Sequence, residues 1–332
     1  MISGKILNIG RLHCPIEYLK GGLFFSLVDY RNNYFTSDDP NKIIEFYNGF
    51  ENRDQLIQWM RERPKGVVTI HEVEGDKEII VVIPTADFNG KYAKECRENI
   101  FKGLHMVFVE SGGRGDFYFN IAHNVNVGIK KAMEYNPKWI VISADDMYKI
   151  DDISVLKNEL TRLDPDRFSM VFTQESAYHS IPARFSKLRR TRFFILLYYT
   201  KLKLKQRIKI ASDQKNIERK FECKYFVIPK RGLTKLAYKR GFNFISFTDF
   251  SIYSSSFVRY FSGNIYDEVF VNSQEDHDIA IEFFLENRAY NFIDFKIGDY
   301  VGSTLGTGVV RNLRELTGIV YLNYKYMGKV TI

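Results

Sequence analysis

Two adjacent carboxylates, Asp145 and Asp146, follow closely on a short apolar run at residues 139–143. Such a run is typical of a buried strand, so we expect the pair at the carboxyl end of that strand. Mg²⁺ and Mn²⁺ take one or two protein carboxylates and complete their shell with phosphate oxygens. The pair could therefore hold a cation that neutralises a diphosphate leaving group. Two acids alone are more often a turn that caps a helix, here a helix expected to begin near residue 151.

A third acid, Glu110, follows the apolar run at residues 105–109 and precedes a glycine-rich turn at residues 111–115. An acid at a strand tip can bind a ribose hydroxyl or a nucleobase N–H, and glycine lets the backbone approach a ligand closely. A plain tight turn has the same pattern, as does the glycine motif of methyltransferases that use S-adenosylmethionine. We rank the methyltransferase lower because its motif follows the first strand of the domain, whereas Glu110 follows the second.

Further acids, Glu275, Asp276 and Asp278, surround His277 where an amphipathic helix is expected over residues 276–287. Negative charge at a helix N-terminus compensates the helix dipole and contributes about 0.3–1 kcal/mol. An aspartate in this position could also act as a general base that takes the proton from an attacking hydroxyl. Taken singly, dipole compensation is the better explanation.

The elements that must position these acids alternate along the chain. Strands are expected at residues 79–83, 105–109 and 139–143, with helices at 91–101 and 118–135 between them. This alternation predicts an α/β fold with a doubly wound, mainly parallel sheet. In such sheets ligands bind beyond the carboxyl ends of the strands. Further strands are expected near residues 168–173, 225–228, 242–247 and 291–296.

We divide the chain into three parts. Residues 1–76 are expected to be an N-terminal accessory segment, with a strand at 23–28, a helix starting at residues 37–40 and a second helix at 52–63. Residues 77–300 are expected to be the catalytic domain and residues 301–332 a helical tail. Within the catalytic domain, residues 77–165 would bind a nucleotide and residues 166–300 an acceptor, with a basic and aromatic insertion at 184–210.

Composition limits the class of protein. The chain has 332 residues, of which 45% are hydrophobic, so it can bury a sizeable core and is not expected to be disordered. Its net charge of +8 favours acidic partners such as nucleotide phosphates, nucleic acid or an anionic membrane surface. The three cysteines have no metal-binding or disulfide spacing, which favours a reducing, cytoplasmic setting. Neither a signal peptide at residues 1–20 nor an apolar run long enough to span a bilayer is apparent.

The insertion has three open explanations. Residues 184–209 combine many Lys and Arg side chains with an aromatic centre at residues 193–199. They could form a helix with a solvated basic face, contact an anionic membrane surface, or hold a lipid-pyrophosphate acceptor. Nucleic acid is not expected as the partner because no RNA-binding signature accompanies the charge. Membrane contact would place the protein on the inner membrane face, facing the cytoplasm.

Taken in chain order, these motifs resemble those of GT-A glycosyltransferases of family 2. Residues 84–87 resemble the family's P-T-Y-N opening, residues 109–116 its V-D-D-G-S-x-D, residues 126–132 its N-x-G-I-x-x-A, and residues 144–146 the site of its D-x-D motif. Residues 266–278, with Arg288, resemble F-D-E followed by E-D-x-D and an arginine, and residues 323–328 resemble a loose K-W-G. The order and spacing fit over residues 78–328, although each motif is short.

The resemblance implies a GT-A fold with a Rossmann-like central sheet and an inverting hexosyltransferase that uses a UDP- or GDP-sugar. The nucleotide-sugar would contact Pro84, Thr85, Ala86, Glu110, Asn126, Ala144 and Asp145. Asp146, with Asp145, would bind Mn²⁺ or Mg²⁺. Asp276 would be the general base, and Glu275 would shape the acceptor side. The acceptor would be a glycan, a lipid-linked group or a protein.

The sequence departs from this pattern in three places. Ala86 replaces the usual aromatic residue, Val125 stands where an arginine often precedes the N-x-G, and Ser143 replaces the first acid of the longer D-x-D-D form. Two alternatives stay open: a nucleotidyltransferase, which would want a basic, glycine-rich loop after the first strand, and a catalytically silent, membrane-associated relative.

Overall fold

The computed structural model describes residues 36–175, 203–223, 250–286, 288–300 and 309–326. The strands expected at residues 23–28, 225–228 and 242–247 lie outside these ranges, as does most of the insertion at 184–210.

Eight strands form one sheet. In their order across the sheet they are β1 (Thr69–Val73), β3 (Leu104–Glu110), β2 (Asp76–Thr85), β4 (Trp139–Ser143), β7 (Phe250–Ser254), β6 (Met170–Glu175), β8 (Tyr290–Asp299) and β5 (Met147–Lys149). The strands expected at residues 79–83, 105–109, 139–143, 168–173 and 291–296 correspond to β2, β3, β4, β6 and β8.

The α/β class is confirmed, but the sheet is mixed rather than mainly parallel. β2 is parallel to both β3 and β4, and β6 is parallel to β8. The other four of the seven pairings are antiparallel. These involve β1, β5 and β7, which are three to five residues long and were not predicted. A continuous apolar run identifies a buried strand, whereas a short strand of mixed composition leaves little pattern, even where it lies inside the sheet as β7 does.

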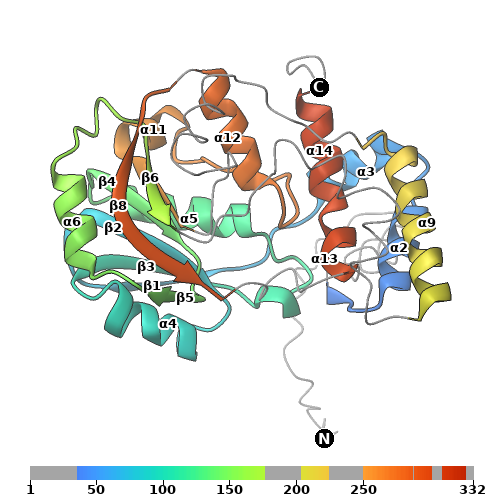
Figure 1. Cartoon of the computed structure of the whole chain (residues 1–332), viewed down its shortest axis with the longest axis horizontal. Coiled ribbons are helices and arrows are strands. Elements are labelled where there is room, and N and C mark those ends of the chain that lie inside the picture. The colour runs from blue at the N-terminus through green and yellow to red at the C-terminus, as the bar shows by residue number, and fades with distance from the viewer. Residues whose placement is uncertain (1–35, 176–202, 224–249, 287, 301–308, 327–332) are drawn as a thin grey trace, which may run out of the picture.

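Helices cover both faces of the sheet (Figure 1). On one face lie α4 (Lys91–Glu95), continued by the π-helical turn Cys96–Ile100, and α6 (Ile153–Thr161). On the other lie α5 (Ile121–Met133), α11 (Ser255–Tyr260) and α12 (Glu275–Leu285). In β2, Ile79, Val81 and Ile83 pack toward the first face, and Ile80 and Val82 toward the second. The run at residues 79–83 is therefore continuously apolar because both faces of the strand are buried.

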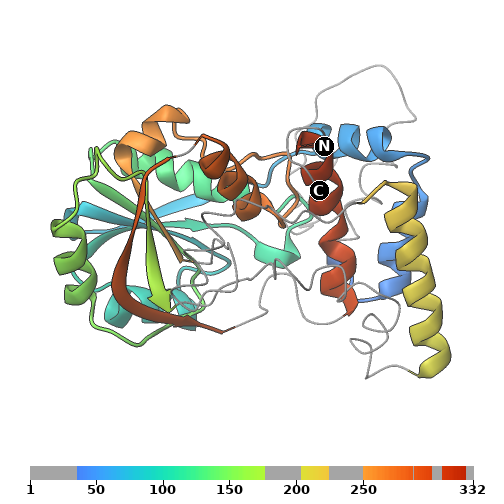
Figure 2. The same ribbon diagram turned by 45° about the horizontal axis from the view of Figure 1, so that its top comes forward.

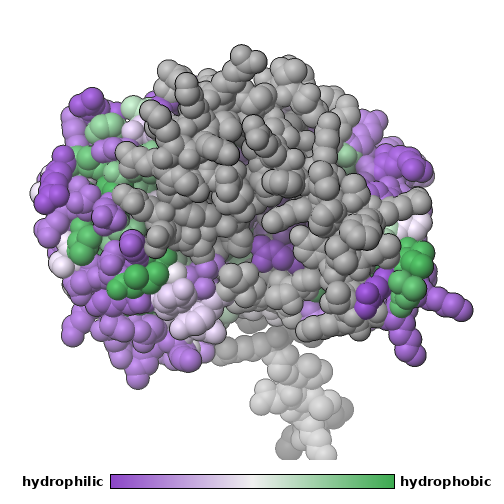
Figure 3. All heavy atoms as spheres, in the orientation of Figure 1, coloured by the Kyte–Doolittle hydropathy of each residue, from purple (hydrophilic) through white to green (hydrophobic). Residues whose placement is uncertain are grey.

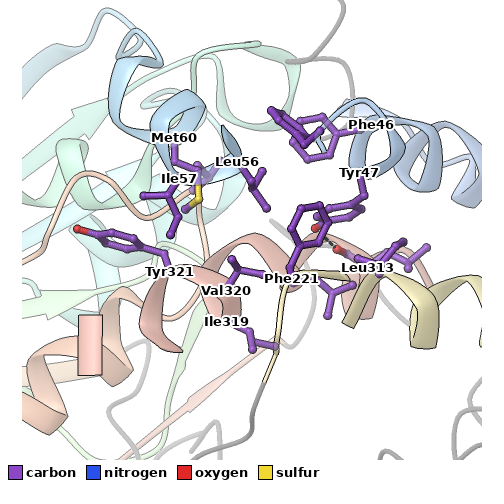
Figure 4. Close-up of a cluster of buried hydrophobic side chains, with 14 of the residues drawn as sticks. Phe46, Tyr47, Leu56, Ile57, Met60, Phe221, Leu313, Ile319, Val320 and Tyr321 are labelled. Atoms are coloured by element: carbon purple, nitrogen blue, oxygen red, sulfur yellow. Dashed lines mark hydrogen bonds between the residues drawn. The ribbon is translucent and has the colours of Figure 1, made fainter. Parts of the chain in front are cut away.

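A second cluster of helices packs beside the sheet. It consists of α2 (Pro40–Asn48), α3 (Arg53–Glu62), α9 (Leu204–Lys220), α13 (Val309–Arg314) and α14 (Leu316–Tyr326). Their apolar side chains share one core, and the Tyr47 hydroxyl donates to the Leu313 carbonyl at 2.6 Å (Figure 4). We call this unit the helical lobe. It joins the predicted accessory segment, the end of the insertion and the tail, which the sequence shows only as separate segments.

The start of the sheet differs from the predicted boundary. β1 pairs with β3, so the sheet begins before residue 77. The helix starts predicted at residues 37–40 and 52–63 are confirmed: the Asp39 side chain accepts from the Asn41 N–H, and the Asn52 side chain accepts from the Gln55 N–H. Among the helices of the described ranges, none combines the length and apolar character needed to cross a bilayer.

Gly128 allows α5 to lie close to the sheet. A Cβ atom at this position would stand 2.4 Å from Val82 Cγ1 and 2.8 Å from Val109 Cγ2. We expect Gly128→Ala to lower the free energy of unfolding by about 1–2 kcal/mol. Two contacts under 3 Å put the cost of overpacking at about 2–3 kcal/mol, and better helix propensity returns about 1 kcal/mol. Urea unfolding monitored by circular dichroism measures the change. The exposed helical control Asn158→Ala should be neutral or slightly stabilising; a Gly128→Ala protein as stable as that control would refute the close packing.

Candidate functional site

The acid pair lies at the end of β4, as predicted. It does not cap the following helix, because Asp152 does so: its side chain accepts from the Ser154 N–H at 3.0 Å. The strand β5 also intervenes between the pair and α6. Helix capping, the simpler explanation of these two acids, therefore does not apply to Asp145 and Asp146.

Thr85 joins the ends of three strands. Its Oγ1 donates to Asp145 Oδ2 at 2.6 Å, which connects the end of β2 to the end of β4. Its carbonyl accepts from the Ser111 N–H at 3.0 Å, which connects β2 to the turn after β3. Three predicted residues flank this junction: Pro84 is buried, Ala144 is half-buried and Ala86 is exposed. These contacts bring six predicted residues to one edge of the sheet: Pro84, Thr85, Ala86, Ala144, Asp145 and Asp146.

The environment of the pair suits a cation. Burial raises the pKa of Asp145 to about 6, against the hydrogen bond from Thr85, and the adjacent Asp146 charge adds to the rise. A divalent cation would offset this cost and favour the ionised carboxylates. The described ranges contain no cluster of three or more His, Cys, Asp or Glu side chains arranged for a metal. A cation held by this pair would complete its shell with water or phosphate oxygens.

Cys96 forms a hydrogen bond with the backbone of the acid pair. Its thiol donates to the Asp145 carbonyl at 3.3 Å, and burial, together with the nearby acids, raises its pKa. The thiol therefore stays protonated at neutral pH and acts as a fixed donor in the loop. No sequence pattern indicates this contact, because the two residues are 49 positions apart.

Glu110 lies at the end of β3 and is held there by two partners. His71 Nε2 is 2.7 Å from Glu110 Oε2, and the Phe88 N–H donates to Oε1 at 3.1 Å. Both hydrogen bonds lower the pKa of Glu110, and the bond with His71 has the larger effect. The His71 ring stacks on Phe88, with centroids 4.2 Å apart. Each carboxylate oxygen has two lone pairs, so Glu110 retains acceptor capacity for a ligand.

Asn126 lies apart from this edge and is fully buried. Its Nδ2 donates to the Tyr266 carbonyl at 2.8 Å and to Glu268 Oε1 at 3.0 Å, and its Oδ1 accepts from the Tyr266 N–H at 3.1 Å. These contacts give Asn126 the role of positioning the loop at residues 266–268. They lend no support to the predicted contact with a nucleotide-sugar.

Glu275 and Asp276 open α12, and both side chains are half-buried. Asp276 Oδ1 accepts from the His277 N–H at 2.8 Å. The Asp276 charge also reaches two buried phenols, Tyr253 and Tyr266, whose pKa values are raised by burial first and by this charge in addition. The carboxylate therefore sits at the edge of an apolar region and retains partial access to solvent.

The acids at residues 145–146 and 275–276 form two groups at the same end of the sheet. The link that the structure describes runs through the β3–α5 loop, where Asn120 Nδ2 donates to the Phe270 carbonyl at 2.9 Å and the Ile121 N–H donates to Asn272 Oδ1 at 2.8 Å. The N-terminal end of α12 lies beside α14 (Figure 1, Figure 2). The first group adjoins the face covered by α4, and Asp276 the face covered by α5 and α12.

Lys325 of α14 fixes the region around Asp276. Its Nζ lies 2.8 Å from Asp278 Oδ2 and 3.2 Å from Asp267 Oδ2. The Tyr326 hydroxyl donates to Asp278 Oδ1 at 2.8 Å. The helical lobe thus holds both the loop after residue 266 and the first turn of α12. The K-W-G-like segment at residues 323–328 was the only signal of this role.

We expect Lys325→Met to destabilise the protein in a pH-dependent way. Burial raises the pKa of Asp278 from 3.8 to about 6, although Lys325 lowers it. A carboxyl whose pKa is raised in the folded protein stabilises the fold when the pH is below its pKa in the unfolded state. This contribution is lost as the pH rises through its pKa in the folded state. Removing Lys325 raises the pKa of Asp278 in the folded state further. The free energy of unfolding should therefore fall by about 3 kcal/mol at pH 8 and by less at pH 5.

Urea unfolding of both proteins at the two pH values measures this difference. The control is Lys138→Met, which removes an exposed ion pair with Glu78 and should cost less than about 1 kcal/mol at either pH. An equal loss for Lys325→Met at pH 5 and pH 8 would show that Asp278 is not the group that responds.

Comparisons of the chain with models of protein families, with curated proteins and with solved structures find no match.

Proposed function

We propose that this chain is a glycosyltransferase that moves a sugar from a nucleotide-diphosphate sugar to an acceptor hydroxyl with inversion, using Mn²⁺ or Mg²⁺. The observation that carries the proposal is the hydrogen bond from Thr85 to Asp145 at 2.6 Å. It orients one carboxylate of the acid pair and brings the ends of β2 and β4 together beside the end of β3. Two carboxylates at such an edge are the ligands that a protein typically supplies to a cation that also binds a diphosphate.

The order of residues along this edge matches the order of groups in a nucleotide-sugar. Glu110 at the end of β3 offers acceptor oxygens for a nucleobase or ribose. Thr85 at the end of β2 lies next to it, and Asp145 and Asp146 follow at the end of β4. A cation held by this pair would supply positive charge to the diphosphate as it leaves. The parallel trio β3–β2–β4 supports the GT-A type of sheet that the motifs imply.

The transfer itself is a direct displacement. The acceptor oxygen bonds to the anomeric carbon, the bond from that carbon to the diphosphate oxygen breaks, and the hydroxyl proton passes to a base. We assign the base role to Asp276, whose carboxylate is half-buried at the start of α12. Lys325 and Tyr326 hold the first turn of α12 through Asp278, which limits movement of the base.

The proposal is tested by offering the chain UDP- and GDP-sugars with Mn²⁺ or with EDTA. Thermal shift measures binding, and mass spectrometry measures release of the nucleoside diphosphate. We expect stabilisation by at least one nucleotide-sugar that needs the metal, together with slow release of its diphosphate. Stabilisation without turnover, even with acceptors present, would favour the silent binding protein. Release of pyrophosphate from a nucleoside triphosphate and a sugar phosphate would favour the nucleotidyltransferase, and no response to any nucleotide-sugar would overturn the proposal.

We further propose that α9 holds the protein on the inner, cytoplasmic face of an anionic membrane. The first two turns of α9 expose Leu204 (65%) and Ile208 (53%), flanked by the exposed Lys205 and Lys209. Figure 3 shows hydrophobic atoms bordered by long hydrophilic side chains at the end of the molecule where α9 lies. Aliphatic side chains among lysines suit the boundary between lipid headgroups and acyl chains. Arg189, Arg190 and Arg192, which made the insertion a membrane candidate, lie outside the described residues.

Co-sedimentation with vesicles tests this contact. Each lysine near an anionic surface contributes about 1 kcal/mol, or roughly fivefold. The double change Lys205→Gln and Lys209→Gln should therefore weaken binding to phosphatidylglycerol-containing vesicles about 25-fold. The matched control Lys91→Gln and Lys102→Gln alters two exposed lysines on the sheet side and should change binding little. Equal binding by all three proteins, or no binding by the unmodified chain, would refute the contact.

A further inference from the structure

Three exposed tyrosines lie together beside the acid pair. Tyr92 belongs to α4, Tyr148 to β5, and Tyr300 follows β8. Their exposed fractions are 41%, 40% and 55%. The ring centroids of Tyr148 and Tyr300 are 5.1 Å apart, and those of Tyr92 and Tyr300 are 6.1 Å apart. We call this group the tyrosine patch. Clustered exposed aromatic rings are costly to hydrate and mark surfaces that bind ligands or partners.

The tyrosine patch is joined to the acid pair by the backbone. The Tyr300 N–H donates to the Asp146 carbonyl at 2.8 Å, and Tyr148 is the second residue after Asp146. Figure 1 shows α4, β5 and the carboxyl end of β8 side by side at the same edge of the sheet. A ligand on the patch would therefore lie next to the carboxylates at the end of β4.

Gly298 sets the orientation of one ring. A Cβ atom on Gly298 would stand 2.1 Å from Tyr148 Cζ and 2.4 Å from its hydroxyl oxygen. The Tyr148 ring thus lies directly on the bare backbone of β8, from which any other residue would displace it. Because the displaced group would be the far end of a side chain, the ring can be moved without disturbing the core.

The geometry of the patch favours a sugar over a nucleobase. The Tyr148 and Tyr92 rings are inclined to the Tyr300 ring by 51° and 40°, so the three do not offer one flat surface to a planar base. A sugar ring has C–H groups on its faces and hydroxyls at its edge, which match the apolar ring and polar tip of tyrosine. The proposed nucleobase contact, Glu110, lies on β3, on the far side of β2 from β4.

We propose that the tyrosine patch binds a sugar ring of a glycan acceptor. This inference rests on the proposed function, which makes the glycan an acceptor. Because the patch adjoins α4 and Asp276 adjoins the face covered by α5 and α12, the sugar ring on the patch would be separate from the one whose hydroxyl reacts. The binding of a glycan by the patch does not itself require transfer.

An array of immobilised oligosaccharides, probed with the labelled chain, tests the patch without catalysis. We expect the unmodified chain to bind at least one glycan. The double change Tyr148→Ala and Tyr300→Ala should weaken that binding at least about tenfold. Gly298→Ala should weaken it as well, because it moves the Tyr148 ring while keeping the phenol. Tyr260→Ala, which removes a tyrosine of similar exposure (57%) on α11, should bind as the unmodified chain does.

The outcomes separate this inference from the proposed function. No glycan binding by the unmodified chain, or equal binding by the patch variants, overturns the patch. Loss of UMP or GMP binding in the patch variants, with glycan binding intact, would mean that the rings hold the nucleobase and would also overturn it. The chain could bind a glycan through the patch and yet show no metal-dependent response to nucleotide-sugars. That result would support the patch and exclude the proposed transferase function.

Discussion

Asp146→Asn should abolish the metal-dependent response to nucleotide-sugars and lower any transfer rate about 100- to 1,000-fold. The substitution keeps the size of the side chain and removes one of the two charges at the end of β4. A neutral amide oxygen is a weaker ligand for a hard cation, and the diphosphate would then leave with less of its charge neutralised. Thermal shift with Mn²⁺ and release of the nucleoside diphosphate measure the two parts of the effect.

The control for this substitution is Asp152→Asn, six residues further along. Asparagine serves as a helix N-cap about as well as aspartate, so α6 should keep its start. The Asp152 variant should retain both the metal response and turnover. If Asp146→Asn behaved in the same way, the acid pair would be a structural turn and the proposed cation site would be wrong.

Asp276→Asn should lower kcat about 100- to 10,000-fold while leaving donor binding within about twofold. The amide still accepts the hydrogen bond from the His277 N–H, so the start of α12 is kept. It cannot take a proton from an acceptor hydroxyl. A loss confined to kcat would separate this residue from the acid pair, whose removal impairs binding of the metal and donor.

Initial rates over a range of donor concentrations measure this split. Asp294→Asn, which neutralises an exposed carboxylate on β8, serves as the matched control and should keep full activity. An Asp276→Asn enzyme with an unchanged kcat would show that another group is the base. The dyad of His123 and Glu268, whose side chains are 2.9 Å apart, would then be the next residues to test.

The strands β2, β3 and β4 could be predicted from sequence because burial on both faces leaves an uninterrupted apolar run. β4 matches the predicted range residue for residue, and β2 and β3 extend theirs by one to three residues at either end. The acid pair was located by the same logic, since a residue after such a strand must lie at the edge of the sheet. Gly128 and Asn126, which form one motif in the sequence, turn out to serve packing and loop positioning.

The remaining parts depend on contacts between distant residues, which a single sequence does not display. β1 has an alternating pattern of only five residues, which is too short to identify a strand. It nevertheless brings His71 to Glu110, which is 39 positions away in the sequence. The helical lobe draws on three separate stretches whose apolar faces show only that each needs a partner. Lysine and apolar residues alternate at the start of α9, a pattern that also fits a strand, but the segment is helical from Leu204, and its apolar residues pack on the lobe.

The cation site is the claim on which the rest depends, and titration of Mn²⁺ followed by electron paramagnetic resonance tests it most directly. Free Mn²⁺ gives a sharp signal that is lost on binding, so the number of bound ions and their affinity can be counted with and without a nucleotide-sugar. We expect one ion per chain, bound more tightly when the matching nucleotide-sugar is present, and lost in Asp146→Asn. Binding that is absent under all these conditions, or unchanged in Asp146→Asn, would contradict it.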